Sequence, residues 1–239
     1  MIAEFPKNEI CDVIFLTKTI NDDVFRMTDT AIKSLHASEK DNKFRVIVVE
    51  SGNLGYKYQA HMTIPYYGDF SYNKALNMAF ANLQSKWVAV FNNDVIFTEN
   101  WFSEMIMNMN IFNLDSASPW CPVPQVGPNP QAQQKILSYP DHAVIVGYEV
   151  LTIFAGWGWL MKRQVLESLL PQPEDLTFWF VDNHMSMQLQ TMGYKHATVT
   201  ASKVHHLGQK SYSHISSDKI HAMTHGLQEK FVSKWSHLV

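Results

Sequence analysis

The chain has 239 residues, of which 46% are apolar and 17% are charged. This composition excludes an intrinsically disordered chain, and the length fits one large domain over residues 1–239, with or without an appendage. The net charge of -3 excludes a uniformly basic nucleic-acid binder. Charge is nevertheless uneven, because residues 195–239 hold 6 Lys, 2 acidic residues and 7 of the 11 His. A basic, His-rich end fits an anionic ligand or, equally, a solvated helix.

The sequence predicts no membrane span, because no stretch approaches 18 consecutive apolar residues. Residues 1–9 hold no apolar run and do not resemble a secretory signal. The two cysteines, Cys11 and Cys121, are too few for a disulfide framework and lack metal-ligand spacing. These features predict a cytoplasmic protein in a reducing compartment.

Strand-like and helix-like segments alternate through the first half of the chain. Short apolar runs rich in β-branched residues predict strands at 12–19, 44–49, 61–65 and 86–91. Apolar residues at spacings of three and four predict helices at about 22–38, 71–83 and 99–109. This alternation implies βαβ units, and therefore an α/β fold with a mainly parallel sheet. Ligands bind such sheets at the carboxyl ends of the strands.

The second half of the chain is less regular. Five prolines from Pro119 to Pro130 predict a loop over 119–131. The remaining predicted elements are a strand at 143–153, helices at about 162–170 and 182–191, a strand at 196–201 and a C-terminal helix from about Ser216.

The segment Asn92-Asn93-Asp94 directly follows a predicted buried strand, at the edge of the sheet where ligands bind. The carboxylate of Asp94 can hold a divalent cation, and the Asn side chains can hydrogen-bond a ribose or a diphosphate. Taken alone, such a segment after a strand is more often an ordinary turn than a ligand site.

Two other segments carry groups for acid–base or metal chemistry. Asp182 lies at the predicted start of a helix, where a carboxylate is favoured in its charged form and can accept a proton from an alcohol, or act as a plain cap. The pair His205-His206 ends a predicted strand. Neighbouring residues of an extended chain point to opposite faces, so only one of the two can bind a given Mg²⁺ or Mn²⁺ ion.

The segment Gly156-Trp157-Gly158-Trp159 is the third candidate. Small residues beside Trp let an indole cover the apolar face of a sugar, although tight packing at a strand end explains the segment too. The sequence holds no GxGxxG or GxxxxGK[ST] motif, which argues against dinucleotide and P-loop phosphate binding. It holds no GxSxG or HExxH motif either.

The order of these segments resembles that of the GT-A nucleotide-sugar glycosyltransferases, in particular the inverting enzymes of family two. The resemblance covers about residues 10–212. In chain order it rests on Thr17, Glu50, Asn73–Ala79, Asn92–Asp94, the Gly/Trp segment before Lys162-Arg163, Phe178–Asp182, Gly193–Lys195 and His205–Ser211. It implies the GT-A fold, a Rossmann-like sheet flanked by helices, with a C-terminal segment on the acceptor side.

The resemblance implies a metal and diphosphate motif at Asn92-Asn93-Asp94, which the family usually writes Asp-x-Asp. Asn92 stands at the first Asp, so Asp94 is the one carboxylate of the motif. The late metal-binding His matches His206 or His205, with His206 preferred. The implied cofactor is Mn²⁺ or Mg²⁺.

The resemblance also implies a catalytic base and substrate contacts. Asp182 matches the Asp of the family's Glu-Asp pair, which carries the catalytic base, while Val181 occupies the position of the Glu. The donor-binding positions are Thr17 and Glu50 near the base and ribose, and Asn77 in the helix that closes over the nucleotide. The acceptor is expected on the tryptophans, which are Trp157, Trp159 and Trp179.

The implied activity is inverting transfer of a sugar from a nucleotide sugar, by default a UDP-sugar, to an acceptor hydroxyl. About residues 10–110 would bind the donor, 111–212 would hold the acceptor and catalytic side, and 213–239 would form a helical tail. A non-catalytic nucleotide-sugar or glycan-binding module on the same scaffold is the alternative, since Asn92 and Val181 depart from the family pattern. A nucleotidyltransferase is weaker still, because only Lys18 is basic near the first strand.

The acceptor is a glycan or, in a phage-type enzyme working in the host cytoplasm, a hydroxymethylated DNA base. The DNA hypothesis rests on lysines of the C-terminal region that would meet phosphates. These are Lys203, Lys210, Lys219, Lys230 and Lys234. The sequence does not indicate the sugar, the linkage or the oligomeric state.

Overall fold

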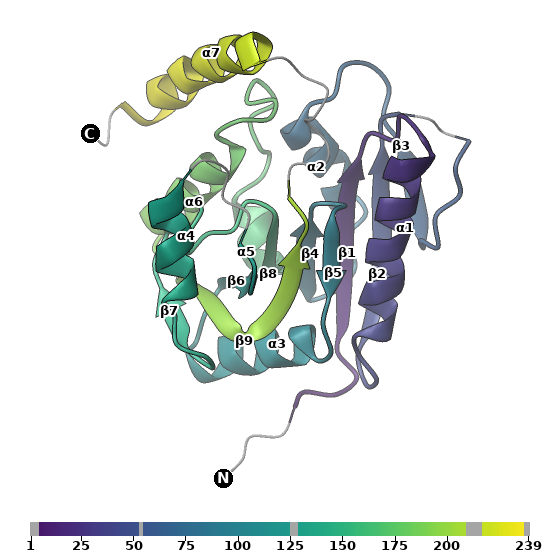
Figure 1. The fold of residues 1–239 in the computed structure, drawn as a ribbon, viewed down its shortest axis with the longest axis vertical. Helices are drawn as coiled ribbons and strands as arrows, with labels where there is room; N and C mark the ends of the chain where they lie inside the picture. Colours follow the sequence, from purple (N-terminus) through teal and green to yellow (C-terminus); the bar gives the residue numbers. More distant parts are fainter. Residues whose placement is uncertain (1–4, 53–54, 125–128, 209–216, 237–239) are drawn as a thin grey trace.

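The computed structural model describes residues 5–52, 55–124, 129–208 and 217–236. Within these residues the strands form one twisted sheet with helices packed around it (Figure 1). The strands are β1 (Ile10–Thr17), β2 (Lys43–Glu50), β3 (Met62–Pro65), β4 (Trp87–Phe91), β5 (Val95–Phe97), β6 (Ser116–Trp120), β7 (Val144–Val146), β8 (Gly158–Lys162) and β9 (His196–His206). The helices are α1 (Asp22–Ala37), α2 (Tyr72–Phe80), α3 (Trp101–Ile111), α4 (Pro130–Leu137), α5 (Arg163–Ser168), α6 (Val181–Thr191) and α7 (Ser217–Trp235).

The sheet has the strand order β3-β2-β1-β4-β8-β6-β9-β5, and β7 pairs with β9 beside this path. The first four strands in that order are parallel, so Thr17 and Glu50 lie side by side where β1 and β2 end. Strand β8 runs antiparallel to β4 and β6, whereas β9 runs parallel to β6 and antiparallel to β5 and β7. The predicted α/β fold is confirmed, with its Rossmann-like parallel part in the first half of the chain.

Both faces of the sheet are covered, because buried strands alternate apolar residues toward each side. In β1, Val13 and Phe15 face one core together with α1 and α3. Their neighbours Ile14 and Leu16 face a second core together with α2, α5 and α6. The apolar strands of the first half therefore pack against helices on both faces of the sheet.

The helices predicted in the first half are confirmed to within a few residues, and local capping explains their starts. The Asn21 side chain accepts a hydrogen bond from the Val24 N–H at 3.0 Å and begins α1. Ser71 does the same for the Lys74 N–H at the start of α2, with a longer contact of 3.4 Å. Each cap satisfies a donor that the first helical turn leaves unpaired.

The predicted loop over 119–131 is wrong at both ends. Strand β6 extends to Trp120, and its register against β9 shifts between Pro119 and Trp120, so the proline without an N–H sits where the pairing is irregular. Helix α4 begins at Pro130, a position that needs no N–H. The predicted strand at 143–153 is also wrong beyond β7, because Gly147 and Leu151 both have positive φ.

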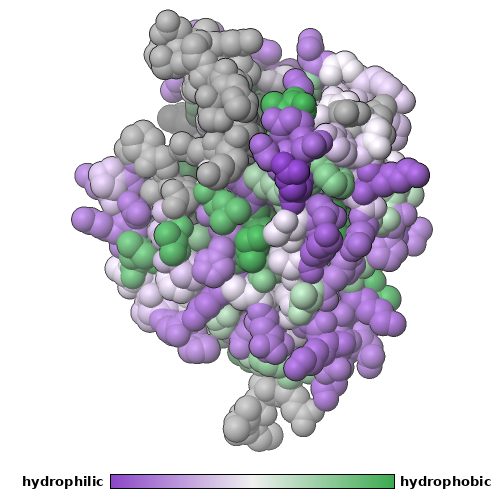
Figure 2. All heavy atoms as spheres, turned by 45° about the vertical axis from the view of Figure 1, so that its right-hand side comes forward, coloured by the Kyte–Doolittle hydropathy of each residue, from purple (hydrophilic) through white to green (hydrophobic). Residues whose placement is uncertain are grey.

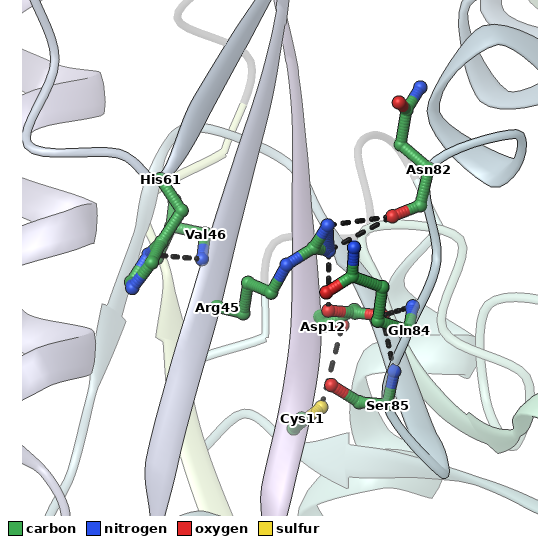
Figure 3. Close-up of polar contacts among 8 residues, drawn as sticks. All are labelled: Cys11, Asp12, Arg45, Val46, His61, Asn82, Gln84 and Ser85. Carbon is green, nitrogen blue, oxygen red and sulfur yellow. Dashed lines mark hydrogen bonds and ion pairs between the residues drawn. The ribbon is translucent and has the colours of Figure 1, made fainter.

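A buried ion pair ties the lower ends of β1 and β2 to the turn that enters β4 (Figure 3). Asp12 is completely buried, and its Oδ1 accepts a hydrogen bond from Arg45 at 2.9 Å. Its Oδ2 accepts from the backbone N–H groups of Gln84 and Ser85 at 2.6 and 2.8 Å. Arg45 also donates to the Asn82 carbonyl. The carboxylate therefore sits at the centre of a fully paired cluster.

The face of the molecule that carries α1 is largely hydrophilic, with small separated hydrophobic areas (Figure 2). None of the helices in the described part of the chain combines the length and the apolar character needed to cross a bilayer.

Candidate active site

A cavity of about 230 Å³ opens beyond the ends of β4, β6 and β9, on the side of the sheet where α6 begins. Its wall is mainly apolar and includes several aromatic side chains, and few polar side chains reach it. The wall includes the polar residues Asn92, Asp182 and His206 and the tryptophans Trp120, Trp157 and Trp179. A mostly apolar pocket with a small number of convergent polar groups is the usual form of a ligand site.

Asp182 enters this cavity from the first turn of α6. The residue before the helix, Phe180, has a left-handed φ of 66°, which turns the chain sharply into α6. The Asp182 Oδ1 accepts a hydrogen bond from the Asn183 N–H at 2.9 Å. Burial raises the pKa of the Asp182 carboxyl, against backbone hydrogen bonds from Asn183 and from its own N–H that lower it. A raised pKa suits a carboxylate that accepts a proton.

Gly156 provides the space for this carboxylate. A Cβ atom at position 156 would lie 2.6 Å from the Asp182 Oδ2 and 3.1 Å from its Cβ. Only a residue without a side chain fits there unless Asp182 moves.

We therefore expect Gly156→Ala to displace the Asp182 carboxylate and to lower kcat by about 10²-fold, since misplacing a reacting group by an ångström has effects of this size. The melting temperature and steady-state kinetics would measure the effect. Gly226→Ala is the matched control, because a Cβ at that helical position meets nothing within 4 Å. An unchanged kcat in Gly156→Ala would contradict the placement of Asp182 at the reacting atoms.

Asp94 and His206 form the second polar group of the site. The pairing of β5 with β9 sets Val95 opposite His206, which brings Asp94 beside the same imidazole. The His206 Nε2 lies 3.3 Å from the Asp94 Oδ1, and the two side chains are 10% and 5% exposed. The imidazole stacks on Trp157, with ring centroids 5.1 Å apart and planes 7° apart. The His206 Nδ1 is buried and has no hydrogen-bond partner among the described residues.

These two residues fit part of a divalent metal site. Carboxylate oxygen and imidazole nitrogen are ligands that Mn²⁺ accepts, and the unpartnered His206 Nδ1 leaves this ring incompletely satisfied by the protein. Within the described ranges no group of three or more His, Cys, Asp or Glu side chains could hold a metal ion. Any metal here would therefore take its other ligands from a bound diphosphate or from water.

His205 does not line the cavity. It pairs with Ile96 in the β5–β9 ladder, one position from His206. Because side chains alternate along a strand, the two rings leave β9 on opposite sides. The preference for His206 over His205 agrees with this geometry.

Thr17 and Asn93 lie in a buried polar cluster and not in the cavity wall. The Asn93 Nδ2 donates to Thr17 Oγ1 at 3.1 Å and to Thr28 Oγ1 at 3.0 Å. Thr17 is 2% and Asn93 is 6% exposed. The cluster fixes the turn after β4 against β1 and α1, and leaves Asn92 as the motif residue that lines the cavity.

Glu50 also lies at the expected strand end, but both of its oxygens already accept hydrogen bonds. Oε1 accepts from the N–H groups of Thr19 and Gly52, and Oε2 accepts from the Tyr58 hydroxyl at 2.5 Å. In this arrangement Glu50 fixes the segment after β1, and its expected contact with the ribose stays a prediction.

Asn77 holds α2 to the segment before α6. Its Nδ2 donates to the Gln172 carbonyl, and its Oδ1 accepts from the Gln172 N–H, both at 2.9 Å. Asn77 is not part of the cavity wall. The structure therefore does not place Asn77, a predicted donor-binding residue, with the site residues around the cavity.

The tryptophans divide between the cavity and the core. Trp157 and Trp179 line the cavity as expected for acceptor-binding residues. The expectation for Trp159 is wrong, because it is 2% exposed and packs in the core beneath the sheet with Leu76 and Phe154. Trp159 lies inside β8, where alternation turns it away from the site.

Sequence reasoning missed three aromatic residues of the cavity wall, which are Tyr72, Trp120 and Phe178. Burial raises the pKa of the Tyr72 hydroxyl, and the neighbouring Asp182 raises it further. The run Phe178-Trp179 was a signal, whereas Trp120 was hidden in a proline-rich segment.

The lysines expected to meet DNA phosphates have protein partners where the structure describes their side chains, two of them carboxylates and one a backbone carbonyl. Lys203 pairs with Asp141 at 3.1 Å, and Lys234 pairs with Asp175 at 3.1 Å. Lys230 donates to the Asp175 carbonyl at 3.4 Å. Lys210 and the side chain of Lys219 lie outside the described residues.

Comparisons with known proteins identify structures of similar fold. A mannosyltransferase from Pyrobaculum calidifontis, solved with GDP-Man and Mn²⁺, is 15% identical with a TM-score of 0.60, over 87% of this chain and 59% of that chain. TarS from S. aureus is 12% identical with a TM-score of 0.57, over 82% and 59%. GalNAc-T7, solved with UDP, GalNAc and Mn²⁺, is 12% identical with a TM-score of 0.61, over 93% and 48%. This chain thus spans about half to three fifths of their lengths.

The likeness to these structures shows the fold, which is that of the GT-A glycosyltransferases. Residues 68–170 match the family model of glycosyl transferase family 2, which confirms the resemblance seen in the sequence. No curated protein matches the sequence.

Proposed function

We propose that the chain is an inverting glycosyltransferase that moves a sugar from a nucleotide sugar to an acceptor hydroxyl. One observation carries the proposal: Asp182 and His206, with Asp94 behind it, reach the same aromatic cavity from two different elements. The cavity thereby brings a candidate general base close to a pair of residues that could hold a diphosphate through a metal.

Asp182 is the general base of the proposed reaction. Its carboxylate accepts the proton of the acceptor hydroxyl while that oxygen attacks the anomeric carbon of the donor sugar. The bond from that carbon to the nucleoside diphosphate breaks on the opposite face, so the anomeric configuration inverts without a covalent intermediate. The raised pKa of Asp182 favours this proton transfer.

Asp94 and His206 are the proposed protein ligands of a divalent metal, with Mn²⁺ or Mg²⁺ as candidates. A bound metal would neutralise the charge that develops on the leaving diphosphate. Asn92, which lines the cavity beside them, is free to hydrogen-bond a phosphate oxygen. Residues of about 10–110 then bind the donor, and residues of about 111–212 form the acceptor and catalytic side, from which His206 reaches the metal on the donor diphosphate.

The nucleotide and the acceptor are further parts of the proposal. UDP is the first nucleotide to test, with GDP next, since structures of the same fold hold UDP and GDP-Man. A sugar hydroxyl of a glycan is the favoured acceptor, because Trp157 and Trp179 offer indole faces on which a sugar ring can stack. The cavity wall in the described residues contains no Lys or Arg, so a DNA acceptor is less well supported.

We expect UDP or GDP to raise the melting temperature only when Mn²⁺ or Mg²⁺ is present, since a ligand that binds only the folded state stabilises it by mass action. A thermal-shift series over nucleotides, metals and added chelator measures this. Asp94→Asn and His206→Gln should remove the metal-dependent part.

Each outcome of that series has a meaning. No shift with any nucleotide or metal would overturn the donor and metal assignments together. Donor binding with no transfer to any glycan, or to hydroxymethylated DNA, would favour the non-catalytic binding module.

As the pH is lowered, the rate of transfer is expected to fall at a higher pH than it would if the base were a carboxylate of ordinary pKa. Asp182 must be deprotonated to accept a proton, and burial raises its pKa above the usual value. Activity is therefore lost as the pH falls through that raised pKa and is retained above it. A profile of kcat against pH gives the inflection, and a value at or below about 3.9 would contradict the assignment.

A further inference from the structure

We infer that the C-terminal helix α7 is a positioning element for Asp182, acting through Phe231 and Trp235; this inference rests on the proposed function. Helix α7 lies outside the layered body of the molecule (Figure 1). Neither Phe231 nor Trp235 lines the cavity, so both act through the residues that flank Asp182.

The first contact lies directly before Asp182. The Phe231 ring stacks on the ring of Phe180, with centroids 5.4 Å apart and planes 19° apart. Phe180 is the residue with a left-handed φ of 66° at the start of α6. A non-glycine residue in that conformation persists only when its surroundings hold it there. The stacked Phe231 supplies such a contact.

The second contact lies directly after Asp182, within the first turn of α6. The Trp235 indole N–H donates to the His184 Nδ1 at 2.9 Å. Burial lowers the pKa of His184 to about 4, Lys234 lowers it as well, and Asp175 opposes them. The imidazole is therefore neutral at pH 7, as an acceptor at Nδ1 must be.

The third contact fixes α7 to the segment that leads into this turn. The Lys234 ammonium lies 3.1 Å from the Asp175 carboxylate, and Lys230 donates to the Asp175 carbonyl at 3.4 Å. Lys230, Phe231, Lys234 and Trp235 are spaced as neighbours on one helix face. One face of α7 thus holds the chain at Asp175, at Phe180 and at His184.

These contacts bracket the candidate base on both sides. Asp182 sits between Phe180 and His184, and its carboxylate has little freedom because Gly156 lies against it. Loss of the α7 contacts would let the turn relax, and the half-buried carboxylate would become more exposed to water. Since burial is what raises its pKa, relaxation lowers the pKa toward the ordinary value.

The test uses the full chain with Trp235→Phe and Phe231→Ala. The first variant keeps a ring and removes the indole donor, and the second removes the stacked ring. Val232→Ala is the matched control, since Val232 is 53% exposed on the same helix. The readouts are the melting temperature, kcat and KM for the donor, and the ¹³Cγ NMR titration of Asp182.

We expect both variants to lower kcat at least about tenfold with little change in donor KM. The Asp182 titration should move to lower pH, and Val232→Ala should change neither. Unchanged kcat and titration in folded variants would overturn the inference. If Phe231→Ala does not fold, Phe231→Leu, which keeps the apolar bulk, and Trp235→Phe decide the question.

The NMR titration separates this inference from the proposed function. A shifted Asp182 titration in the variants, with no transfer by the unmodified protein, would keep the positioning role and reject the glycosyltransferase. Transfer by the unmodified protein with no effect of the variants would do the reverse.

Discussion

Asp182→Asn is expected to lower kcat by about 10²- to 10⁴-fold, the usual contribution of a general base. The amide keeps the size of the carboxylate but accepts no proton at neutral pH. Donor binding should be unchanged, because the proposed metal and diphosphate contacts come from Asp94 and His206 on other elements. Single-turnover transfer and donor titration by calorimetry measure the two quantities separately.

Asp141→Asn is the matched control for this substitution. Asp141 is an exposed acid that pairs with Lys203 and is not one of the residues that line the cavity. It undergoes the same chemical change and should keep full activity. A fully active Asp182→Asn variant would show that another group takes the proton.

Asp12→Ala is expected to lower the free energy of unfolding by about 3–5 kcal/mol, as when one partner of a buried ion pair is removed. The side chain is completely buried, and its loss removes the carboxylate partner of Arg45 and the acceptor of the Gln84 and Ser85 N–H groups. Unfolding in urea, followed by circular dichroism, measures the change in the midpoint.

Two comparisons identify the cause of that loss. Asp69→Ala removes an exposed carboxylate and should leave the midpoint almost unchanged. Asp12→Asn keeps an oxygen for the backbone donors and should cost less than Asp12→Ala. If the alanine variant were as stable as the parent, the cluster around Asp12 would not contribute to stability.

The first half of the fold was predictable because its strands and helices follow from local sequence features, namely apolar runs and helix caps. Strands β1 and β2 contain the apolar runs Val13–Leu16 and Val46–Val49, and β4 is apolar throughout. Helices α1 and α2 start at side chains that cap them. In the second half, β6 is the sequence Ser-Ala-Ser-Pro-Trp, which carries no apolar run and includes a proline. Its place between β8 and β9 is decided by long-range pairing, which no local pattern reveals.

The candidate site was predictable where a residue's role follows from its position at a strand or helix end. Asp94, Asp182 and His206 are such residues, and they lie around one cavity or directly behind it. The hydrogen bonds of Glu50 to Thr19 and Tyr58 were not predictable, because they join segments far apart in sequence. The burial of Trp159 was not predictable either, because no strand was expected at β8, where Trp159 packs in the core.

The two adjacent histidines at the end of β9 have a consequence for changes in chain length. Inserting one residue between Thr200 and Val204, with the start of the strand held by His196 in the core, would bring His205 to the position of His206. Deleting one residue there would instead bring Leu207 beside Asp94. The site should therefore tolerate a longer strand better than a shorter one, a difference that substitutions alone would never reveal.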